Sequence, residues 1–256
     1  MKLEDKVAVI TGGASGLGRA TAEMVIEQGG RVAIFDLNED LGRQTATELG
    51  ENARAYKVDV ADEDSVQAAV EGVMAHFGAI HVNVNCAGIG AAARTLGREA
   101  PMPLDWFTGI VRINLVGTFN TLRLCAWEMQ KNDPVNEDGE RGAIVNTASV
   151  AAFDGQIGQA GYSASKAGVV GMTLPVARDL SRSGIRLCTI APGIFETPMM
   201  AGAPDRVRDP LIDMVQFPKR LGNAAEFALL ARQIIENPYL NGETIRLDGS
   251  IRMAPK

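Results

Sequence analysis

The chain has 256 residues, and its 25 Lys and Arg residues against 31 Asp and Glu residues give a formal net charge of −6. This acidic balance offers no basic stripe for a nucleic acid, and we expect no nucleic-acid partner. No apolar run approaches the ~18 residues of a membrane span, and no signal or transit segment precedes the first predicted strand, so we expect a cytoplasmic protein with no membrane contact.

The first predicted element is a buried parallel strand at 6–11, rich in β-branched residues. It leads into the turn Gly12-Gly13-Ala14-Ser15-Gly16-Leu17-Gly18 and a helix at 17–28. Glycines allow the backbone to approach a pyrophosphate, and the helix N-terminus offers free N–H groups. The segment therefore predicts a dinucleotide site, and a plain glycine-rich turn is the weaker interpretation.

A second strand at 31–36 ends in Asp36, eighteen residues after Gly18. A carboxylate at this place accepts hydrogen bonds from the ribose hydroxyls of a dinucleotide and repels a 2′-phosphate. The next residue is Leu37, so no cation follows to bind that phosphate. The charge pattern favours NAD over NADP. The alternative is an ordinary strand-end or capping residue.

Strands and helices alternate along the rest of the chain, which predicts an α/β fold with one parallel sheet and helices on both faces. Further strands are expected at 54–60, 80–85, 142–148, 185–191 and 244–247. Further helices are expected at 39–49, 63–77, 104–130, 160–182 and 223–236, with a kink or 3₁₀ turn at Pro175. No linker divides the chain, so residues 1–256 form a single Rossmann-type, doubly wound domain of about seven strands.

Two loops interrupt the alternation. The polar stretch 132–142 is expected to be a surface insertion. The stretch 193–221 is long and carries apolar residues, and a long loop at the carboxyl edge of such a sheet is usually a lid over the substrate. It is apolar at Ile194, Phe195, Met199, Met200, Leu211, Met214 and Phe217, among other positions. A loop helix packed on the core would need the same residues.

Tyr162 and Lys166 are separated by one helical turn and follow Ser149 by thirteen and seventeen residues. Positions i and i+4 share one helix face, so the ammonium lies beside the phenol and lowers its pKa. A serine hydroxyl can hold a carbonyl oxygen while the tyrosine transfers a proton to it. The three residues predict carbonyl–alcohol redox chemistry. Taken alone, the Tyr/Lys spacing is more often an ordinary solvated helix face.

Together these motifs resemble the short-chain dehydrogenase/reductase family over nearly the whole chain. The motifs, in chain order, are Thr11-Gly12-x-x-x-Gly16-x-Gly18, Asp59-Val60, Asn85-Cys86-Ala87-Gly88, Asn114, Ser149, Tyr162, Lys166 and Pro192-Gly193. The resemblance implies a catalytic set of Asn114, Ser149, Tyr162 and Lys166. In this set Lys166 also binds the nicotinamide ribose, and Asn114 holds a water that links Lys166 to solvent. The alternative is that Asn114 is only a hydrogen-bonded polar residue in a mostly apolar helix.

The resemblance also implies the residues that bind the cofactor. They are Thr11, Gly12, Ser15, Gly16, Leu17, Gly18, Asp36, Asp59, Val60, Asn85, Ala87, Gly88, Tyr162, Lys166, Pro192, Gly193, Ile194 and Thr197. Asp59 and Val60 would flank the adenine, and the last four would hold the nicotinamide end. Gln156 and Gln159 are weaker candidates for substrate contacts, because surface glutamines are common.

Within the family, three segments look closest to the type 2 3-hydroxyacyl-CoA dehydrogenases, also called type 10 17β-hydroxysteroid dehydrogenases. They are 146–153, 190–198 and 237–249. This implies a small-molecule substrate, an acyl-CoA thioester or a steroid-like ketone or alcohol, and a place in fatty acid metabolism. A 3-oxoacyl-carrier-protein reductase is the runner-up, which Asp36 and Leu37 disfavour. A non-catalytic dinucleotide-binding scaffold is the alternative of another class.

Cys86, Cys125 and Cys188 are widely spaced in apolar surroundings and predict buried free thiols. The only histidines are His76 and His81, so we expect no His-based metal site. Family resemblance further implies a homotetramer in which the helices at 104–130 and 160–182 form one shared interface. Gly161, Gly168 and Gly171 would permit close helix approach there.

Overall fold

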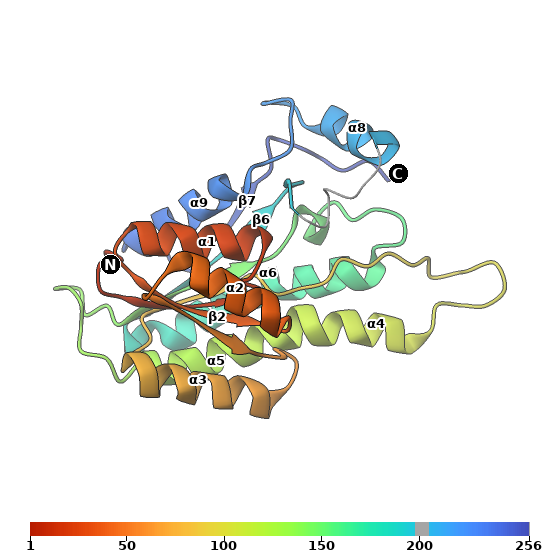
Figure 1. The fold of residues 1–256 in the computed structure, drawn as a ribbon. Helices are drawn as coiled ribbons and strands as arrows, with labels where there is room; N and C mark the ends of the chain where they lie inside the picture. The colour runs from red at the N-terminus through yellow and green to blue at the C-terminus, as the bar shows by residue number, and fades with distance from the viewer. Residues whose placement is uncertain (198–204, 256) are drawn as a thin grey trace.

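The computed structural model describes residues 1–197 and 205–255, which form one seven-stranded sheet flanked by helices (Figure 1). All strand pairings are parallel, and the strand order is β3-β2-β1-β4-β5-β6-β7. The α/β, Rossmann-type architecture is thereby confirmed. The order reverses between β1 and β4, which is where such folds bind their ligands.

The strands are β1 (Val7–Thr11), β2 (Arg31–Asp36), β3 (Ala53–Lys57), β4 (Val82–Asn85), β5 (Gly142–Thr147), β6 (Ile185–Pro192) and β7 (Thr244–Leu247). The α-helices are α1 (Gly16–Glu27), α2 (Glu39–Leu49), α3 (Glu63–Phe77), α4 (Leu104–Val111), α5 (Gly117–Met129), α6 (Ala160–Leu180), α8 (Asp205–Met214) and α9 (Ala224–Glu236). A π-helical turn, η1 (Arg112–Val116), joins α4 to α5, and two 3₁₀ turns are η2 (Val150–Ala152) and η3 (Ser181–Ser183).

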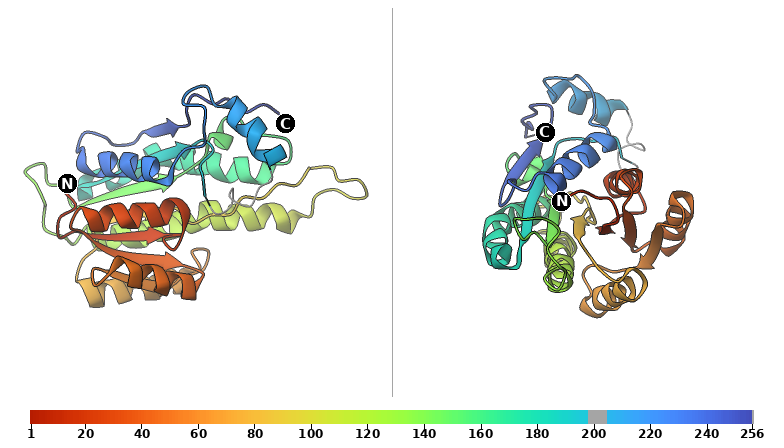
Figure 2. Two further views of the ribbon diagram at one scale, coloured as in Figure 1. Left: turned by 45° about the horizontal axis from the view of Figure 1, so that its top comes forward. Right: turned by 90° about the vertical axis from the view of Figure 1, so that its left-hand side faces the viewer.

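The sheet is covered on both faces (Figure 2). One cluster of buried apolar side chains joins the sheet to α1 and α9, and a second joins its other face to α3 and α5. The central strands are buried on both sides, so every residue of β1, β5 and β6 is buried. This arrangement leaves the carboxyl ends of the strands as the open edge of the molecule.

The expected helix at 104–130 is three segments, because the π-turn η1 widens the helix around Asn114. The strand β3 ends at Lys57 rather than at 60, and Val60 instead packs against α5, where a Cβ at Gly117 would lie 2.6 Å from the Val60 side chain. Pro175 lies within α6, which continues without a 3₁₀ turn until Ser181.

The two irregular loops differ from each other. Within 132–142 the expected surface insertion is anchored, because the Glu140 carboxylate is buried against Arg186 at 2.6 Å. Part of the expected lid at 193–221 is the helix α8, whereas Met199 and Met200 lie outside the described residues. A third long segment, 86–103, projects as an arm between β4 and α4 (Figure 1).

Two of the three glycines assigned to a subunit interface act within the chain. A Cβ at Gly168 would lie 2.6 Å from Leu115, and one at Gly161 would lie 3.2 Å from Ile110. These glycines let α6 pack against α4 and η1 of the same molecule. Gly171 has no atom within 4 Å of its position for a Cβ.

Candidate active site

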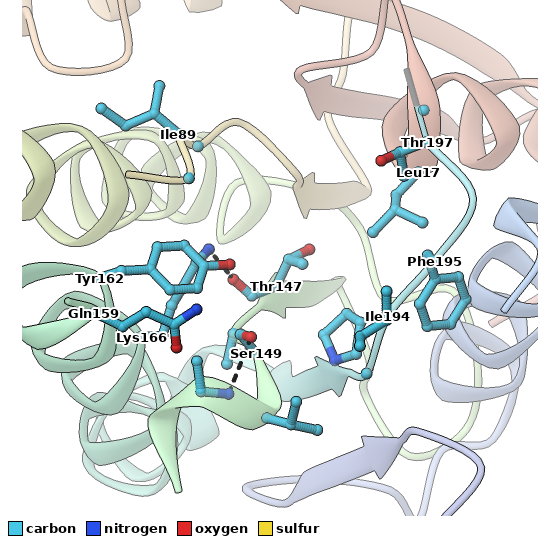
Figure 3. Close-up of a pocket in the computed structure, with 18 of the residues that line it drawn as sticks. Leu17, Ile89, Thr147, Ser149, Gln159, Tyr162, Lys166, Ile194, Phe195 and Thr197 are labelled. Carbon is cyan, nitrogen blue, oxygen red and sulfur yellow. Dashed lines mark hydrogen bonds between the residues drawn. The ribbon is translucent and has the colours of Figure 1, made fainter. Parts of the chain in front are cut away.

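A cavity of about 550 Å³ opens at the carboxyl edge of the sheet (Figure 3). Its walls come from the glycine-rich turn, the loop after β4, the segment after β5, the start of α6, the loop after β6, α8 and the C-terminal tail. Ser149, Tyr162 and Lys166 meet in this cavity although they come from two different elements.

The glycine-rich turn has the shape that a pyrophosphate requires. Gly12 and Gly16 have positive φ angles of 64° and 54°, in the left-handed region that favours glycine. A Cβ at Gly18 would lie 2.2 Å from the Gly12 carbonyl oxygen, so α1 can begin this close to β1 only with glycine there. Ser15, Gly16, Leu17 and Gly18 line the cavity, and the free N–H groups of α1 face the same edge.

Thr11 and Ala87 join the two strands at the point where the strand order reverses. The Ala87 N–H donates to the Thr11 hydroxyl at 3.0 Å, and a Cβ at Gly12 would lie 3.0 Å from the same nitrogen. Asn85 is buried and donates to Asn146 at 2.9 Å, so it supports the sheet from inside. Among the predicted residues of this loop, Gly88 lines the cavity.

Asp36 is held by the backbone on both of its oxygens. The N–H of Ala14 donates to Oδ2 at 3.1 Å, and the N–H of Asn38 donates to Oδ1 at 3.0 Å. The carboxylate is thus fixed beside the glycine-rich turn, with lone pairs left over because each oxygen takes one of these bonds. Leu37 is 66% exposed and places no charge there.

Asp59 and Val60 lie beyond the cavity wall. Asp59 Oδ1 accepts from the N–H of Ala61 at 2.9 Å, and the Val60 carbonyl accepts from Asn120 at 3.1 Å. At the other end of the site, Pro192, Gly193, Ile194 and Thr197 all line the cavity. A Cβ at Gly193 would lie 2.8 Å from the Asp248 backbone, which brings the loop after β6 close to the C-terminal segment.

Ser149 caps the short turn η2 that follows β5. Its Oγ accepts from the N–H of Ala151 at 3.1 Å, which fixes the hydroxyl at the cavity wall (Figure 3). The hydroxyl proton remains available for another acceptor, because the oxygen only accepts in this bond.

Tyr162 and Lys166 lie on one face of α6. The Lys166 ammonium is 5.9 Å from the centre of the Tyr162 ring and donates to the Thr147 carbonyl at 2.8 Å (Figure 3). Burial lowers the pKa of Lys166 to about 8, and the thiol of Cys86 partly opposes this shift. The ammonium is therefore protonated at neutral pH but loses its proton more readily than an exposed lysine.

The pKa of Tyr162 moves in the direction opposite to the one expected from its neighbours. Burial raises it, and the Ser149 hydroxyl only partly lowers it again. Burial dominates because a phenolate is stabilised less than a neutral phenol when it is removed from water. In this state Tyr162 is a neutral phenol that can donate a proton.

Asn114 lies behind the cavity wall and is fully buried. Its amide nitrogen donates to the Ile89 carbonyl at 3.0 Å and to the Ser165 hydroxyl at 3.1 Å, and its oxygen accepts from the Ile89 N–H at 2.8 Å. Both N–H groups of the side chain are therefore used within the protein. Cys86 lines the cavity nearby, and burial raises the pKa of its thiol to about 11, so it stays protonated.

Gln156 and Gln159 both line the cavity but are occupied by protein partners. Gln156 Nε2 donates to the Ala254 carbonyl at 3.0 Å, and Gln159 Oε1 accepts from the N–H of Gln156 at 2.9 Å. Their bonds fasten the C-terminal tail to the segment between Ser149 and Tyr162.

Residues from two other segments complete the cavity and were not predicted from the sequence. Met253 comes from the tail, and Ile89, Ala91 and Ala92 come from the base of the arm. Neither segment carries a motif, and only the fold brings them to the site. The apolar wall that they form adjoins Leu211 of α8.

Within residues 1–197 and 205–255, no group of three His, Cys, Asp or Glu side chains is arranged to hold a metal ion. In the same part of the chain, no helix has both the length and the apolar character needed to cross a bilayer.

The chain is similar to known proteins along its whole length. Residues 6–207 match the family model for short chain dehydrogenase. A relative from Drosophila melanogaster, named 3-hydroxyacyl-CoA dehydrogenase type-2, is 53% identical over 99% of this chain and 100% of its own. The protein of the same name from Homo sapiens is 53% identical over 97% of this chain and 96% of its own. A crystal structure of 3-hydroxyacyl-CoA dehydrogenase type-2 from Mycobacterium avium matches with a TM-score of 0.94 and 42% identity, covering 100% of this chain and 98% of that one.

Proposed function

The chain belongs to the short-chain dehydrogenase family, and we propose that it interconverts 3-hydroxyacyl-CoA and 3-oxoacyl-CoA thioesters with NAD(H). It is an oxidoreductase that uses a nicotinamide dinucleotide. The observation that carries the reaction type is the meeting of Ser149, Tyr162 and Lys166 in one cavity with the glycine-rich turn. The relatives at 53% identity support the substrate class.

The residues present fit such a cofactor. The turn Gly12–Gly18 can fold this tightly only with glycine, because a Cβ at Gly12 or Gly18 would meet backbone atoms. A tight turn of this kind lets the backbone approach the phosphates of a dinucleotide. Gly88 and the loop Pro192–Thr197 would hold the nicotinamide end of the cofactor. Thr11, Asn85 and Ala87 would shape the crevice beneath it. Asp59 and Val60 would flank the adenine. When bound, the dinucleotide supplies the hydride acceptor for alcohols or the hydride donor for ketones.

NAD is preferred over NADP in this proposal because of Asp36. Each of its oxygens keeps a lone pair for a ribose hydroxyl after accepting from the backbone. A 2′-phosphate would meet this carboxylate with Leu37 beside it and no neighbouring cation. The same feature disfavours the alternative of an NADPH-dependent 3-oxoacyl-carrier-protein reductase.

Tyr162 moves the proton. In ketone reduction its neutral phenol, favoured by burial, gives its proton to the carbonyl oxygen. The Ser149 hydroxyl donates to the same oxygen as negative charge develops on it. In alcohol oxidation the phenolate accepts the hydroxyl proton, and this direction needs additional positive charge near the ring beyond that of Lys166.

Lys166 and Asn114 act behind the tyrosine. The Lys166 ammonium would bind the nicotinamide ribose and replace the proton that Tyr162 gives up. Asn114 would hold the water that connects this path to solvent; since both of its N–H groups are bonded to protein, its side chain can offer only a lone pair of the amide oxygen.

The acyl side of the substrate would lie on the apolar wall of the cavity. Residues 193–221 would act as the lid, with Ile194 and Leu211 facing the substrate together with Met253, which packs against the same apolar cluster as Ile194. Gln156 and Gln159 would support this wall, because one polar atom of each side chain is bonded within the chain, and the Gln156 Oε1 and Gln159 Nε2 atoms would be left for the substrate.

A homotetramer is the assembly we propose, built on the surface of α4 and α5. The side chains of Trp106, Phe119 and Trp127 are 49%, 44% and 61% exposed there. Large exposed apolar side chains along neighbouring helices are typical of an interface between subunits. Light scattering at micromolar concentration should give about four times the 27.2 kDa of the chain, and a monomer would contradict this proposal.

The function is tested by NADH oxidation with acetoacetyl-CoA, longer 3-oxoacyl-CoAs, a 3-oxoacyl-carrier protein and a 17-ketosteroid side by side. The expected result is the highest kcat/KM with a CoA thioester and NADH. Preference for the carrier-protein substrate with NADPH would favour the reductase instead. Binding of NADH without turnover of any substrate would indicate the non-catalytic scaffold.

A further inference from the structure

Ser165 lies on α6 between Tyr162 and Lys166, and its side chain is fully buried. Its hydroxyl donates to the Tyr162 carbonyl at 2.7 Å, one turn earlier in the same helix. The same oxygen contacts the amide nitrogen of Asn114 at 3.1 Å. Ser165 is thus the link between the helix that carries Tyr162 and Lys166 and the π-turn that carries Asn114.

The direction of each bond follows from the groups involved. The Tyr162 carbonyl can only accept, so the single hydroxyl proton of Ser165 is used on it. Toward Asn114 the Ser165 oxygen can then only accept, and Asn114 must present its NH₂ group. The amide oxygen is forced to the opposite side, where it accepts from the Ile89 N–H at 2.8 Å.

In this orientation the amide oxygen of Asn114, and not its NH₂ group, borders the space beside Lys166. A Cβ placed on Gly88 would lie 3.0 Å from the Asn114 oxygen and 3.5 Å from the Lys166 ammonium, so both atoms border the same small space. A carbonyl dipole with its oxygen near an ammonium favours the charged form, and an NH₂ group in that place would disfavour it. Exchange of the amide oxygen and nitrogen would therefore deprive Lys166 of a favourable neighbour.

We propose that Ser165 is a positioning residue that, together with the Ile89 backbone, holds the amide of Asn114 with its oxygen beside Lys166 and so favours the charged ammonium. The other bonds that fix this amide come from the Ile89 backbone, at the base of the arm. Ser165 is the side chain that fixes it from the helix of the reacting groups. The proposal rests on the proposed function, because it assumes that Asn114 and Lys166 serve the cofactor and the proton path.

The first test needs no substrate. NADH affinity, measured by fluorescence from pH 6 to pH 10, should fall as the pH rises through about 8 in the unmodified protein, where Lys166 loses its proton. In Ser165→Ala the midpoint should move down by about 0.5 pH unit, because the amide then keeps only its two bonds to the Ile89 backbone and its oxygen is held less firmly beside Lys166. Ser163→Ala is the matched control, since the Ser163 hydroxyl lies on the same helix and has no hydrogen-bond partner among the described residues.

The second test is a double-mutant cycle on kcat. Ser165→Ala should lower kcat about tenfold, as expected for one hydrogen bond, with an unchanged KM for the thioester. In an Asn114→Ala background the same substitution should change kcat by less than about twofold, because the bond to the Tyr162 carbonyl stays within one turn of α6 and only the bond to Asn114 reaches another element. Ser165→Thr keeps a hydroxyl that can bond the carbonyl three residues earlier and should retain the unmodified pH midpoint.

An unchanged midpoint in Ser165→Ala, or equal losses with and without Asn114, would overturn the proposal. If Ser165→Ala fails to fold, a shifted midpoint in Ser165→Thr despite its hydroxyl would also overturn it. Absence of turnover with every 3-oxoacyl-CoA in the unmodified protein would instead contradict the proposed function, while the NADH titration would still decide the role of Ser165.

Discussion

Two buried cations in this chain have opposite surroundings. Arg186, near the amino ends of the strands, uses all five of its N–H groups, on Glu140 and on the carbonyls of Ile234, Ile235 and Leu240. Lys166, at the carboxyl edge, makes one hydrogen bond within the described residues and borders a cavity.

The difference separates a charge whose hydrogen bonds are complete within the protein from one that has donors left for a ligand. A buried charge whose hydrogen bonds are complete has no capacity left for a ligand, and removing its partner is costly. A buried charge with unused donors is unfavourable in the free protein, and the lowered pKa of Lys166 records that cost. We therefore expect substitutions at the carboxyl edge to change turnover and substitutions at the amino edge to change stability.

Tyr162→Phe should give the largest effect. It should lower kcat more than about 10³-fold, because the variant has no proton to transfer. The free energy of unfolding and the affinity for NADH should stay close to those of the unmodified protein, since the ring is retained. Steady-state rates and fluorescence titration measure both quantities. More than a few per cent of residual kcat would contradict the role of Tyr162.

Glu140→Ala should have the largest effect on stability, about 3–5 kcal/mol, because it leaves the Arg186 guanidinium buried without its carboxylate. The kcat of the folded fraction should not change. Glu63→Ala is the matched control, because the Glu63–Arg123 pair is exposed to solvent and should contribute less than about 1 kcal/mol. Urea unfolding of the two variants checks the difference, and equal losses would argue against it.

The sequence predicted which residues meet around the glycine-rich turn better than which residues form the apolar wall of the cavity. The glycine-rich turn, Asp36 and the Tyr162/Lys166 pair depend on short-range spacing, which a sequence displays directly. Met253 and the arm residues reach the cavity only through the folding of distant segments, and no local pattern marks them. The fold was predictable for the same reason, because alternating strands and helices leave few topologies.

Side-chain environments were harder to predict than positions. The raised pKa of Tyr162 follows from burial, which spacing along a helix does not show. Glu140 lies in a polar loop, which predicts an exposed side chain, yet its carboxylate is buried in an ion pair with Arg186. Gly161 and Gly168 have the small size that an interface needs, but the neighbours that they admit belong to the same chain.

Asp36 is an anion whose hydrogen bonds are likewise incomplete, because its carboxylate retains lone pairs beside the proposed ribose site. Asp36→Ala combined with Leu37→Arg should shift the ratio of kcat/KM for NADH and NADPH by about 10²-fold toward NADPH, since it removes a repulsive charge and adds an attractive one. Leu37→Ala serves as the control. A kcat/KM for NADPH that equals or exceeds that for NADH in the unmodified enzyme would contradict the charge argument.

Replacing Lys166 or Arg186 by methionine should change the free energy of unfolding in opposite directions. Lys166 has a folded-state pKa of about 8, below the 10.5 of a free lysine, so the folded protein binds this proton more weakly than the unfolded chain. The contribution of Lys166 to stability is therefore unfavourable at neutral pH, and it disappears as the pH rises from about 8 to about 10.5. Lys166→Met should raise the free energy of unfolding by about 1–2 kcal/mol at pH 7, less than the shift alone implies because the bond to Thr147 is lost.

The gain from Lys166→Met should shrink as the pH rises through that window, because the unmodified protein then becomes more stable while the variant has no proton to lose. Arg186→Met should lower stability at every pH in the range, since it strands the Glu140 carboxylate in the interior. Denaturant unfolding at pH 7 and pH 10 separates the two. A loss of stability at pH 7 for Lys166→Met would mean that its single hydrogen bond outweighs the cost of burying the charge, and the two cations would then differ in degree and not in kind.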